Sequence, residues 1–265
     1  MISITSRKRP ARRAAFGLLS AAFWLCVWQR AAVRAGQEIL VAPPAAVLRR
    51  LWELSGRADF WLTVLFSMGR VVEGFALGVV LGTAAAVLTE AVPFFDALFR
   101  PILGIIKATP VASFIILALV WMKSARVPVF VSVLIVLPLV WANVSEGIRK
   151  TDRGLLEMAR LYRFGAARTV RLVYAPSVLP YFLAAGTTGM GMAWKGGVAA
   201  EVLSSLPLSL GGEIYRSKIY LETADLFAWT AVVVVLSVLL ERAMVRLLRT
   251  ADRRIVRARG GEHGG

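Results

Sequence analysis

The sequence predicts an all-α polytopic membrane protein with six transmembrane helices. Hydrophobic residues make up 58% of its 265 residues, charged residues only 18%, and the mean hydropathy is +0.68. An average soluble domain has about 25% charged residues. The apolar residues also form long runs, and residues 127–144 and 175–194 contain no charged side chain. Such runs match the roughly 20 apolar residues that a helix needs to cross a bilayer core.

Six apolar segments are expected to be helices, because backbone groups cannot remain unpaired in hydrocarbon. A basic stretch before the first segment is also typical of a secretory signal, but Trp24, Trp28, Gln29 and Arg30 favour a retained span. The transmembrane domain, 14–247, lies between a basic tail, 1–13, and a basic and polar tail, 248–265. The expected spans are 14–33, 63–89, 102–122, 127–145, 175–199 and 224–245.

The distribution of Lys and Arg predicts that both termini are cytoplasmic. With six spans, 21 of the 32 basic residues fall on the cytoplasmic side and nine in outer loops, as the positive-inside rule requires. Arg49 and Arg50 lie on the unfavoured outer side, and an amphipathic helix over 45–54 lying on the membrane surface would accommodate them. The net charge of +16 is therefore mainly a topology signal, and no nucleic-acid partner is expected.

Several kinds of chemistry are excluded by counting. The chain has one cysteine, Cys26, and one histidine, His263, which excludes a disulfide framework and a His/Cys metal cluster. No Gly-Lys dipeptide occurs, so the phosphate-binding loop of nucleotide hydrolases is absent. We expect no catalytic residue, no metal and no cofactor on this chain. If a nucleotide drives transport here, another polypeptide must bind it.

The second span carries small residues at regular spacing. Gly74, Gly78 and Gly82 repeat every four residues and so share one helix face, where they let a neighbouring backbone approach closely. The pattern predicts helix packing, either within one subunit or at a seam between two subunits. Arg70 and Glu73 lie three residues apart on one face, and we expect them to pair with each other.

The fifth span is unusually rich in glycine. Residues 186–197 contain five glycines, two threonines and two methionines. Hydroxyl and thioether groups facing a gap would suit the lining of a solute pathway; the other interpretation is a kinked packing helix. Lys195 would be costly in lipid, so it should reach the interface, pair with Glu201 or face water. The candidate pathway residues are Thr187, Thr188, Met190, Met192 and Lys195.

The cytoplasmic loop 146–175 has the pattern of a helix with one apolar face. Asp152 is a candidate N-cap, and the apolar face follows at helical spacing as Leu155, Met158, Ala159 and Tyr162.

Gly165 can end this helix, and residues 166–174 can form a second short helix before Pro176. A short exposed helix with an apolar stripe suits docking into a cleft on a soluble partner. A helix lying on the membrane surface would show the same pattern.

This loop resembles the E-A-A-x(3)-G-x(9)-I-x-L-P signature of the permease subunits of binding-protein-dependent ABC importers. Glu157, Ala159 and Pro176 occupy signature positions at the family spacing. The sequence departs from the signature Ala, Gly, Ile and Leu at Met158, Arg163, Val173 and Ala175. The departure from glycine concerns the turn after the helix and therefore the way in which the loop would dock.

Further stretches are similar to the nitrate/sulfonate/taurine-type branch of these permeases, namely residues 73–82, 176–180, 193–202 and 221–229. The resemblance implies the type I ABC importer (MetI-like) permease fold in the inner membrane. It also implies a second permease subunit, identical or a sister chain, a cytoplasmic ATPase that uses ATP and Mg, and an extracytoplasmic solute-binding protein. The implied ATPase-coupling residues are Leu155, Glu157, Met158, Ala159, Tyr162, Arg163, Gly165 and Pro176.

Two other functions remain open at this point. A channel or facilitator acting alone would need no docking helix. A membrane enzyme acting on lipid would need paired carboxylates or a histidine near the interface, and no histidine accompanies the outer acidic residues. We interpret those residues as a contact surface for the binding protein or as solvated loop; they are Glu201, Glu213, Glu222 and Asp225.

The solute is not determined by the sequence. Lys195 with Thr187 and Thr188 favours an anion, in agreement with the nitrate and sulfonate resemblance, but other members of the branch are thought to carry thiamine-precursor-like or other small organic molecules. Transport would proceed by alternating access, in which ATP binding draws the two docking helices together and hydrolysis resets them.

Overall fold

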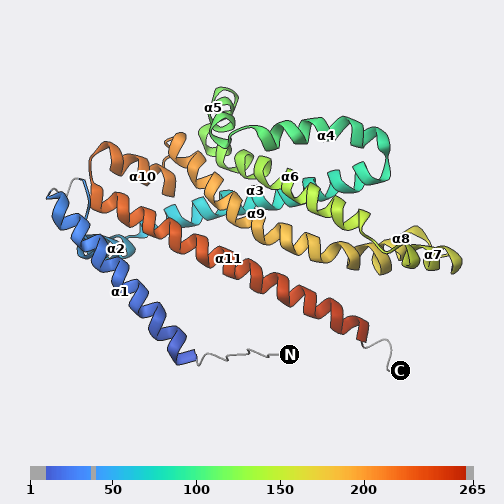
Figure 1. The fold of residues 1–265 in the computed structure, drawn as a ribbon. Helices are drawn as coiled ribbons and strands as arrows, with labels where there is room; N and C mark the ends of the chain where they lie inside the picture. Colours follow the sequence, from blue (N-terminus) through green and yellow to red (C-terminus); the bar gives the residue numbers. More distant parts are fainter. Residues whose placement is uncertain (1–9, 37–39, 261–265) are drawn as a thin grey trace.

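The computed structural model describes residues 10–36 and 40–260, and every regular element within them is helical (Figure 1). A 3₁₀ turn, Ser124–Arg126, precedes α6, and a π-helical turn, Val170–Tyr174, precedes α9. The α-helices are α1 Pro10–Ala35, α2 Pro44–Ser55, α3 Ala58–Ala91, α4 Pro93–Ala108, α5 Val111–Trp121, α6 Val127–Arg149, α7 Arg153–Leu161, α8 Ala166–Thr169, α9 Ala175–Leu203, α10 Leu210–Ile219 and α11 Thr223–Gly260.

The centre of the bundle is α6, packed between α3 and α9. The glycines of α3 make this possible, since a Cβ atom at Gly74 would lie 2.5 Å from the carbonyl oxygen of Val129. Gly78 and Gly82 face α6 in the same way, each with the first contact for an added Cβ under 3 Å. The small-residue face of α3 therefore meets a helix of its own chain in this structure.

The two ends of the bundle are built differently. Figure 1 shows α2 and α10 at one end, called the α10 end below, and α7 with α8 at the other, called the α7 end. The elements α8, the π turn and α9 follow one another without a break over residues 166–203. Pro176 has no N–H to donate to Leu172, and the π-helical turn lies where that hydrogen bond is lost.

Three described helical segments are long and apolar enough to cross a membrane: Ala58–Ala91, Ser124–Arg149 and Thr223–Leu247. They match the predicted second, fourth and sixth spans. The first expected span lies within α1. The fifth lies within α9, which is long enough but does not reach the same hydropathy, because prolines, glycines and threonines dilute its apolar residues. Among the described residues three helical segments are thus long and apolar enough to be spans, or four if one bent pair is counted as a span.

That bent pair corrects the prediction of one continuous span over 102–122. The helices α4 and α5 are bent by 106° at a break between Ala108 and Val111. Pro110 explains the break, because proline removes a backbone donor and forces the residue before it out of the helical region. The helix Pro93–Ala108 also begins well before the expected span.

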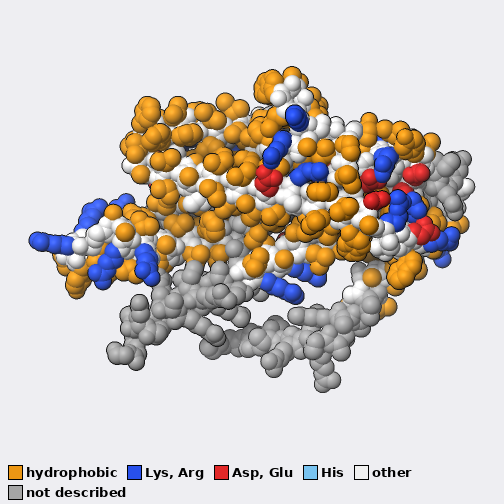
Figure 2. All heavy atoms as spheres, turned by 180° about the vertical axis from the view of Figure 1, so that it is seen from behind, with side chains coloured by type: hydrophobic (Ala, Val, Ile, Leu, Met, Phe, Trp, Pro, Cys, Tyr) orange, Lys and Arg blue, Asp and Glu red, His pale blue; other side chains and the backbone are white. Residues whose placement is uncertain are grey.

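Other boundaries can be compared directly. The amphipathic helix expected over 45–54 is confirmed as α2. The tail expected over 248–265 continues α11 as helix to Gly260, and residues 261–265 lie outside the described part, as do residues 1–9 of the N-terminal tail. Seen from behind, the molecule is covered mainly by hydrophobic side chains, with charged side chains gathered at the two ends and a smaller number in the middle (Figure 2).

Candidate functional site

The helix at the α7 end forms as the sequence predicts. The carboxylate of Asp152 accepts a hydrogen bond from the backbone N–H of Gly154 at 2.7 Å and so caps the first turn. Ala159 is buried beneath the helix, whereas Leu155, Met158 and Tyr162 are exposed to 42%, 40% and 70%. The predicted apolar face is therefore divided. The small side chain of Ala159 is buried, whereas the large apolar side chains remain exposed.

Glu157 is exposed on α7 beside this apolar stripe. Leu161 is exposed to 82% and extends the stripe, although the sequence reasoning did not select it. Behind the helix, a cavity of about 320 Å³ separates α7 from α8 and is lined by Leu156, Phe164 and Thr169 among others. The guanidinium of Arg168 lies over the ring of Phe164 at 4.3 Å, which holds the second wall of that cavity.

The turn after α7 differs from the prediction. Arg163, not Gly165, makes the turn: its φ is 51°, in the left-handed region that glycine adopts without strain. Arg163 occupies the position where the family signature has glycine, and its backbone adopts a conformation that glycine would adopt without strain. Gly165 instead precedes α8 as its N-cap. The short helix expected to end before Pro176 runs on into α9, with Pro176 in its first turn.

The five candidate pathway residues do not share one environment. Thr188, Met192 and Lys195 are exposed on α9 at spacings of four and three, so they form one open face. Met190 is buried, and the hydroxyl of Thr187 donates to the carbonyl of Leu183 at 2.9 Å. The structure therefore brings three of the five candidates together and turns the other two away.

A cavity of about 320 Å³ adjoins this face at the break between α4 and α5. Met192 lines it from α9, and Lys107 and Thr109 line it from the bend. The ammonium of Lys107 lies 5.3 Å from the ring centroid of Trp141, a cation–π contact that places a positive charge beside an otherwise apolar space. Sequence reasoning missed this group because it treated 102–122 as one straight span.

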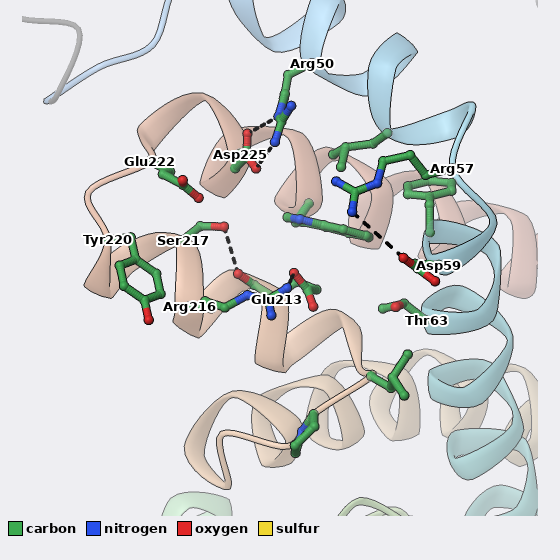
Figure 3. Close-up of a pocket in the computed structure, with 15 residues that line it drawn as sticks. Arg50, Arg57, Asp59, Thr63, Glu213, Arg216, Ser217, Tyr220, Glu222 and Asp225 are labelled. Atoms are coloured by element: carbon green, nitrogen blue, oxygen red, sulfur yellow. Dashed lines mark hydrogen bonds and ion pairs between the residues drawn. The ribbon is translucent and has the colours of Figure 1, made fainter.

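The largest cavity described, about 530 Å³, lies at the α10 end (Figure 3). Arg50 on α2 donates from Nε and Nη2 to the carboxylate of Asp225 on α11, with 2.9 Å for the Nη2 bond. Hydrogen bonds to Asp225, and then to Glu53, raise the pKa of the Arg50 guanidinium. The other charged lining residues are Arg57, Asp59, Glu213, Arg216 and Glu222.

This cavity corrects the interpretation of an outer acidic cluster. Asp225 is paired with Arg50 and Glu213 with Arg216, while Glu201 is fully buried away from the cavity. The surface is one of mixed charge, as the right-hand end of Figure 2 shows. The sequence contained one indication of this pairing, because Arg50 lies on the side that the positive-inside rule disfavours. Its ion pair with Asp225 explains why an arginine is tolerated there.

One expected ion pair is also wrong, and one of the three alternatives for Lys195 is excluded. Arg70 pairs with Glu201 at 3.2 Å, and Glu73 pairs with Arg126 at 2.9 Å, instead of Arg70 with Glu73. Because Arg70 takes Glu201, the pairing of Lys195 with Glu201 does not form, and Lys195 is exposed. Residues three apart can meet on an isolated helix, but partners on other helices compete for them in the bundle.

A bundle of apolar helices with an exposed amphipathic helix at one end and a charged cavity at the other is compatible with a membrane transport subunit. The chain belongs to the family described as binding-protein-dependent transport system inner membrane component, whose profile matches residues 78–257. It is therefore an inner-membrane permease subunit of an ABC importer.

Relatives with described functions agree with this. The putative aliphatic sulfonates transport permease protein SsuC of Bacillus subtilis is 26% identical over 97% of this chain and 94% of its own length. A probable ABC transporter permease of Brucella melitensis is 26% identical over 82% of this chain and 87% of its own length. The bicarbonate transport system permease protein CmpB of Synechocystis sp. is 26% identical over 57% of this chain, and the match spans about half, 54%, of that protein.

Solved structures show the same fold. An amino acid ABC transporter chain superposes with a TM-score of 0.58 at 16% identity, covering 74% of this chain and 93% of that one. The MetNI methionine ABC transporter in an inward-facing conformation gives a TM-score of 0.56 at 17% identity, covering 72% and 93%.

Proposed function

We propose that this chain forms one half of the pathway of an importer for a small anion, and that α7 couples the pathway to a separate ATPase. Each subunit crosses the membrane six times, with α1 and α9 as the first and fifth spans and both termini in the cytoplasm. Two copies form the pathway. An extracytoplasmic binding protein delivers the solute to the α10 end, and the ATPase, which holds the ATP and Mg, contacts the α7 end.

The observation that carries the coupling role is the set of large apolar side chains left exposed on α7. Leu155, Met158, Leu161 and Tyr162 extend from a capped helix at the end of the bundle. Exposed apolar groups rimmed by charge are typical of a protein interface. In Figure 2 the left-hand end, which carries α7 and α8, shows basic side chains around hydrophobic ones.

The continuity of the backbone supports alternating access. The helix that begins at Ala166 behind α7 continues through the π turn into α9, which ends at Leu203 near α10. A displacement of α7 by an ATPase is therefore passed to the helix that carries Thr188, Met192 and Lys195. Rigid elements of this kind move as bodies instead of deforming, so one displacement can change access from both sides.

An anionic solute is supported by the charges beside the pathway. Lys195 on α9 and Lys107 at the bend between α4 and α5 are both exposed near Met192, and a lysine in a membrane segment marks a place that faces water or a solute. The relatives named for transport of bicarbonate and aliphatic sulfonates support the same class. The binding protein, on another chain, sets the choice among such anions.

The test is purification of the tagged chain from native membranes in mild detergent, with native mass spectrometry of what remains bound. We expect two permease subunits with two ATPase subunits. Leu155→Glu should abolish retention of the ATPase, because a carboxylate would enter the apolar contact. Leu221→Glu, an exposed leucine at the opposite end, should retain it. A chain that repeatedly purifies folded and alone would favour the stand-alone channel instead.

A further inference from the structure

A buried polar cluster joins three helices at the α10 end, beneath the mixed-charge cavity. Its centre is the carboxylate of Glu201, in the last turn of α9, which is 0% exposed. Ser67 of α3 donates to one carboxylate oxygen at 2.8 Å, and Arg70 donates to the other at 3.2 Å. The N–H of Gly211, in the first turn of α10, donates to the same oxygen as Ser67, at 3.2 Å.

The cluster also holds the connection between α9 and α10. Nη1 of Arg70 donates to the carbonyl of Leu208 at 3.3 Å, and the N–H of Leu210 donates to the hydroxyl of Ser67 at 2.9 Å. Ser205 and Leu208 have φ values of 47° and 50°. Such conformations cost about 1 kcal/mol or more for residues other than glycine and persist only where surrounding contacts impose them.

The backbones of α9 and α10 are in close contact at this joint. A Cβ atom at Gly211 would lie 2.4 Å from the backbone nitrogen of Val202 and 2.5 Å from the Cβ of Glu201. A Cβ atom at Gly212 would lie 1.9 Å from the carbonyl oxygen of Leu206. The first turn of α10 therefore rests directly on the last turn of α9, with the carboxylate of Glu201 bonded to its backbone.

A buried carboxylate is a poor choice for stability alone. Removing a charge from water carries a large desolvation penalty, and apolar residues of similar volume often stabilise such a site as well or better. A carboxylate that accepts from a side chain on α3 and a backbone N–H on α10 does something that an apolar residue cannot do: it fixes the direction of one helix relative to another.

We propose that Glu201 is a positioning residue that makes α10 move together with α9. The wall of the mixed-charge cavity, which α10 helps to form, would move with it. This inference rests on the proposed function, since α9 is the helix that receives movement from α7. Glu213, Arg216 and Ser217 line the cavity from α10. A displacement of α7 that moves α9 would therefore also move α10. The position of the α10 residues that line the mixed-charge cavity would then change.

The experiment is hydrogen–deuterium exchange of the intact permease–ATPase complex, measured by mass spectrometry without nucleotide and with ATP, Mg²⁺ and orthovanadate. In the native protein, exchange in both 175–203 and 204–219 should change with nucleotide. In Glu201→Gln, 175–203 should still respond, whereas 204–219 should lose its response. The amides of Leu210 and Gly211 should exchange about tenfold faster in both states, because their hydrogen bonds are weakened.

Glu73→Gln is the matched control, since it converts a carboxylate on α3 whose pair with Arg126 is exposed, and it should behave like the native protein. Ser67→Ala removes one bond at each side of the joint and should give the same loss to a smaller degree.

A nucleotide response of 204–219 that persists in Glu201→Gln overturns the proposal, as does its absence in the native protein when 175–203 responds. If neither segment responds in the native complex, the ATPase-driven movement itself is wrong. If neither Glu201→Gln nor Ser67→Ala assembles, the cluster serves folding alone and the proposal is overturned.

Discussion

Arg50 on α2 and Asp225 in the first turn of α11 are 175 residues apart in the chain, and two parallel hydrogen bonds join them. The ion pair connects α2, at the α10 end, to α11, the longest of the described helices. It also accounts for an arginine on the side where the positive-inside rule disfavours one, because Asp225 balances its charge.

Loss of this pair should destabilise the fold modestly. We expect Asp225→Asn to lower the free energy of unfolding by about 1 kcal/mol, since both side chains are only partly buried, at 33% and 14% exposure. Chemical unfolding in detergent micelles measures this. Glu53→Gln removes the other, more exposed partner of Arg50 and should change it by less than about 0.5 kcal/mol. Equal effects of the two variants would contradict the central role of Asp225.

The turn after α7 offers a stabilising substitution. Arg163 has a φ of 51°, and glycine would relieve the strain while increasing the freedom of the unfolded chain. We expect Arg163→Gly to raise the free energy of unfolding by about 0.5–1 kcal/mol.

The control for that substitution is Arg160→Gly, which makes the same change inside α7 and should lower stability by about 1 kcal/mol. Protease resistance of residues 146–175, followed over time, reports the local effect. A loss of resistance in Arg163→Gly would show that the side chain of Arg163 holds the turn by contacts of its own.

The seam between α3 and α6 should reject even a methyl group. Gly74→Ala places a Cβ 2.5 Å from the carbonyl oxygen of Val129, so we expect a loss of about 1–3 kcal/mol. Gly69 lies on the same helix, and an added Cβ there meets nothing within 4 Å. Gly69→Ala should therefore gain up to about 1 kcal/mol from helix propensity. Thermal unfolding of both variants in one detergent tests the sign, and a neutral Gly74→Ala would mean that the helices separate in solution.

The open face of α9 should be reachable by a water-soluble thiol reagent. Cys26 is exposed, so the background for this measurement is Cys26→Ser. We expect Met192→Cys to react with a small charged methanethiosulfonate, and the product to lose uptake. Met190→Cys, two residues away and buried at 4% exposure in the native side chain, should react slowly and keep uptake. Equal reaction rates at both positions would contradict the assignment of this face to the pathway.

Local features were predicted well where neighbouring residues alone decide them. Asp152 caps α7 as expected, because an N-cap involves only the backbone two residues on. The same loop shows the limit: Gly165 was expected to end the helix, but Arg163 makes the turn. When a residue other than glycine adopts the left-handed conformation, the sequence gives no sign of it, because contacts with the surrounding structure impose that conformation.

The sequence by itself determined the class of the protein: long uncharged runs require helices in a bilayer, and a capped amphipathic segment between two of them resembles the coupling loop of importer permeases. Only the tertiary structure decided how the charges are paired and which of the candidate pathway residues share one exposed face of α9. Arg70 has Glu73 three residues away and bonds to Glu201 instead, because a buried carboxylate must be compensated and an exposed one is solvated by water. Glu201 in turn joins α9 to Ser67 and Arg70 of α3, more than 130 residues away in the chain, and to the N–H of Gly211 in α10.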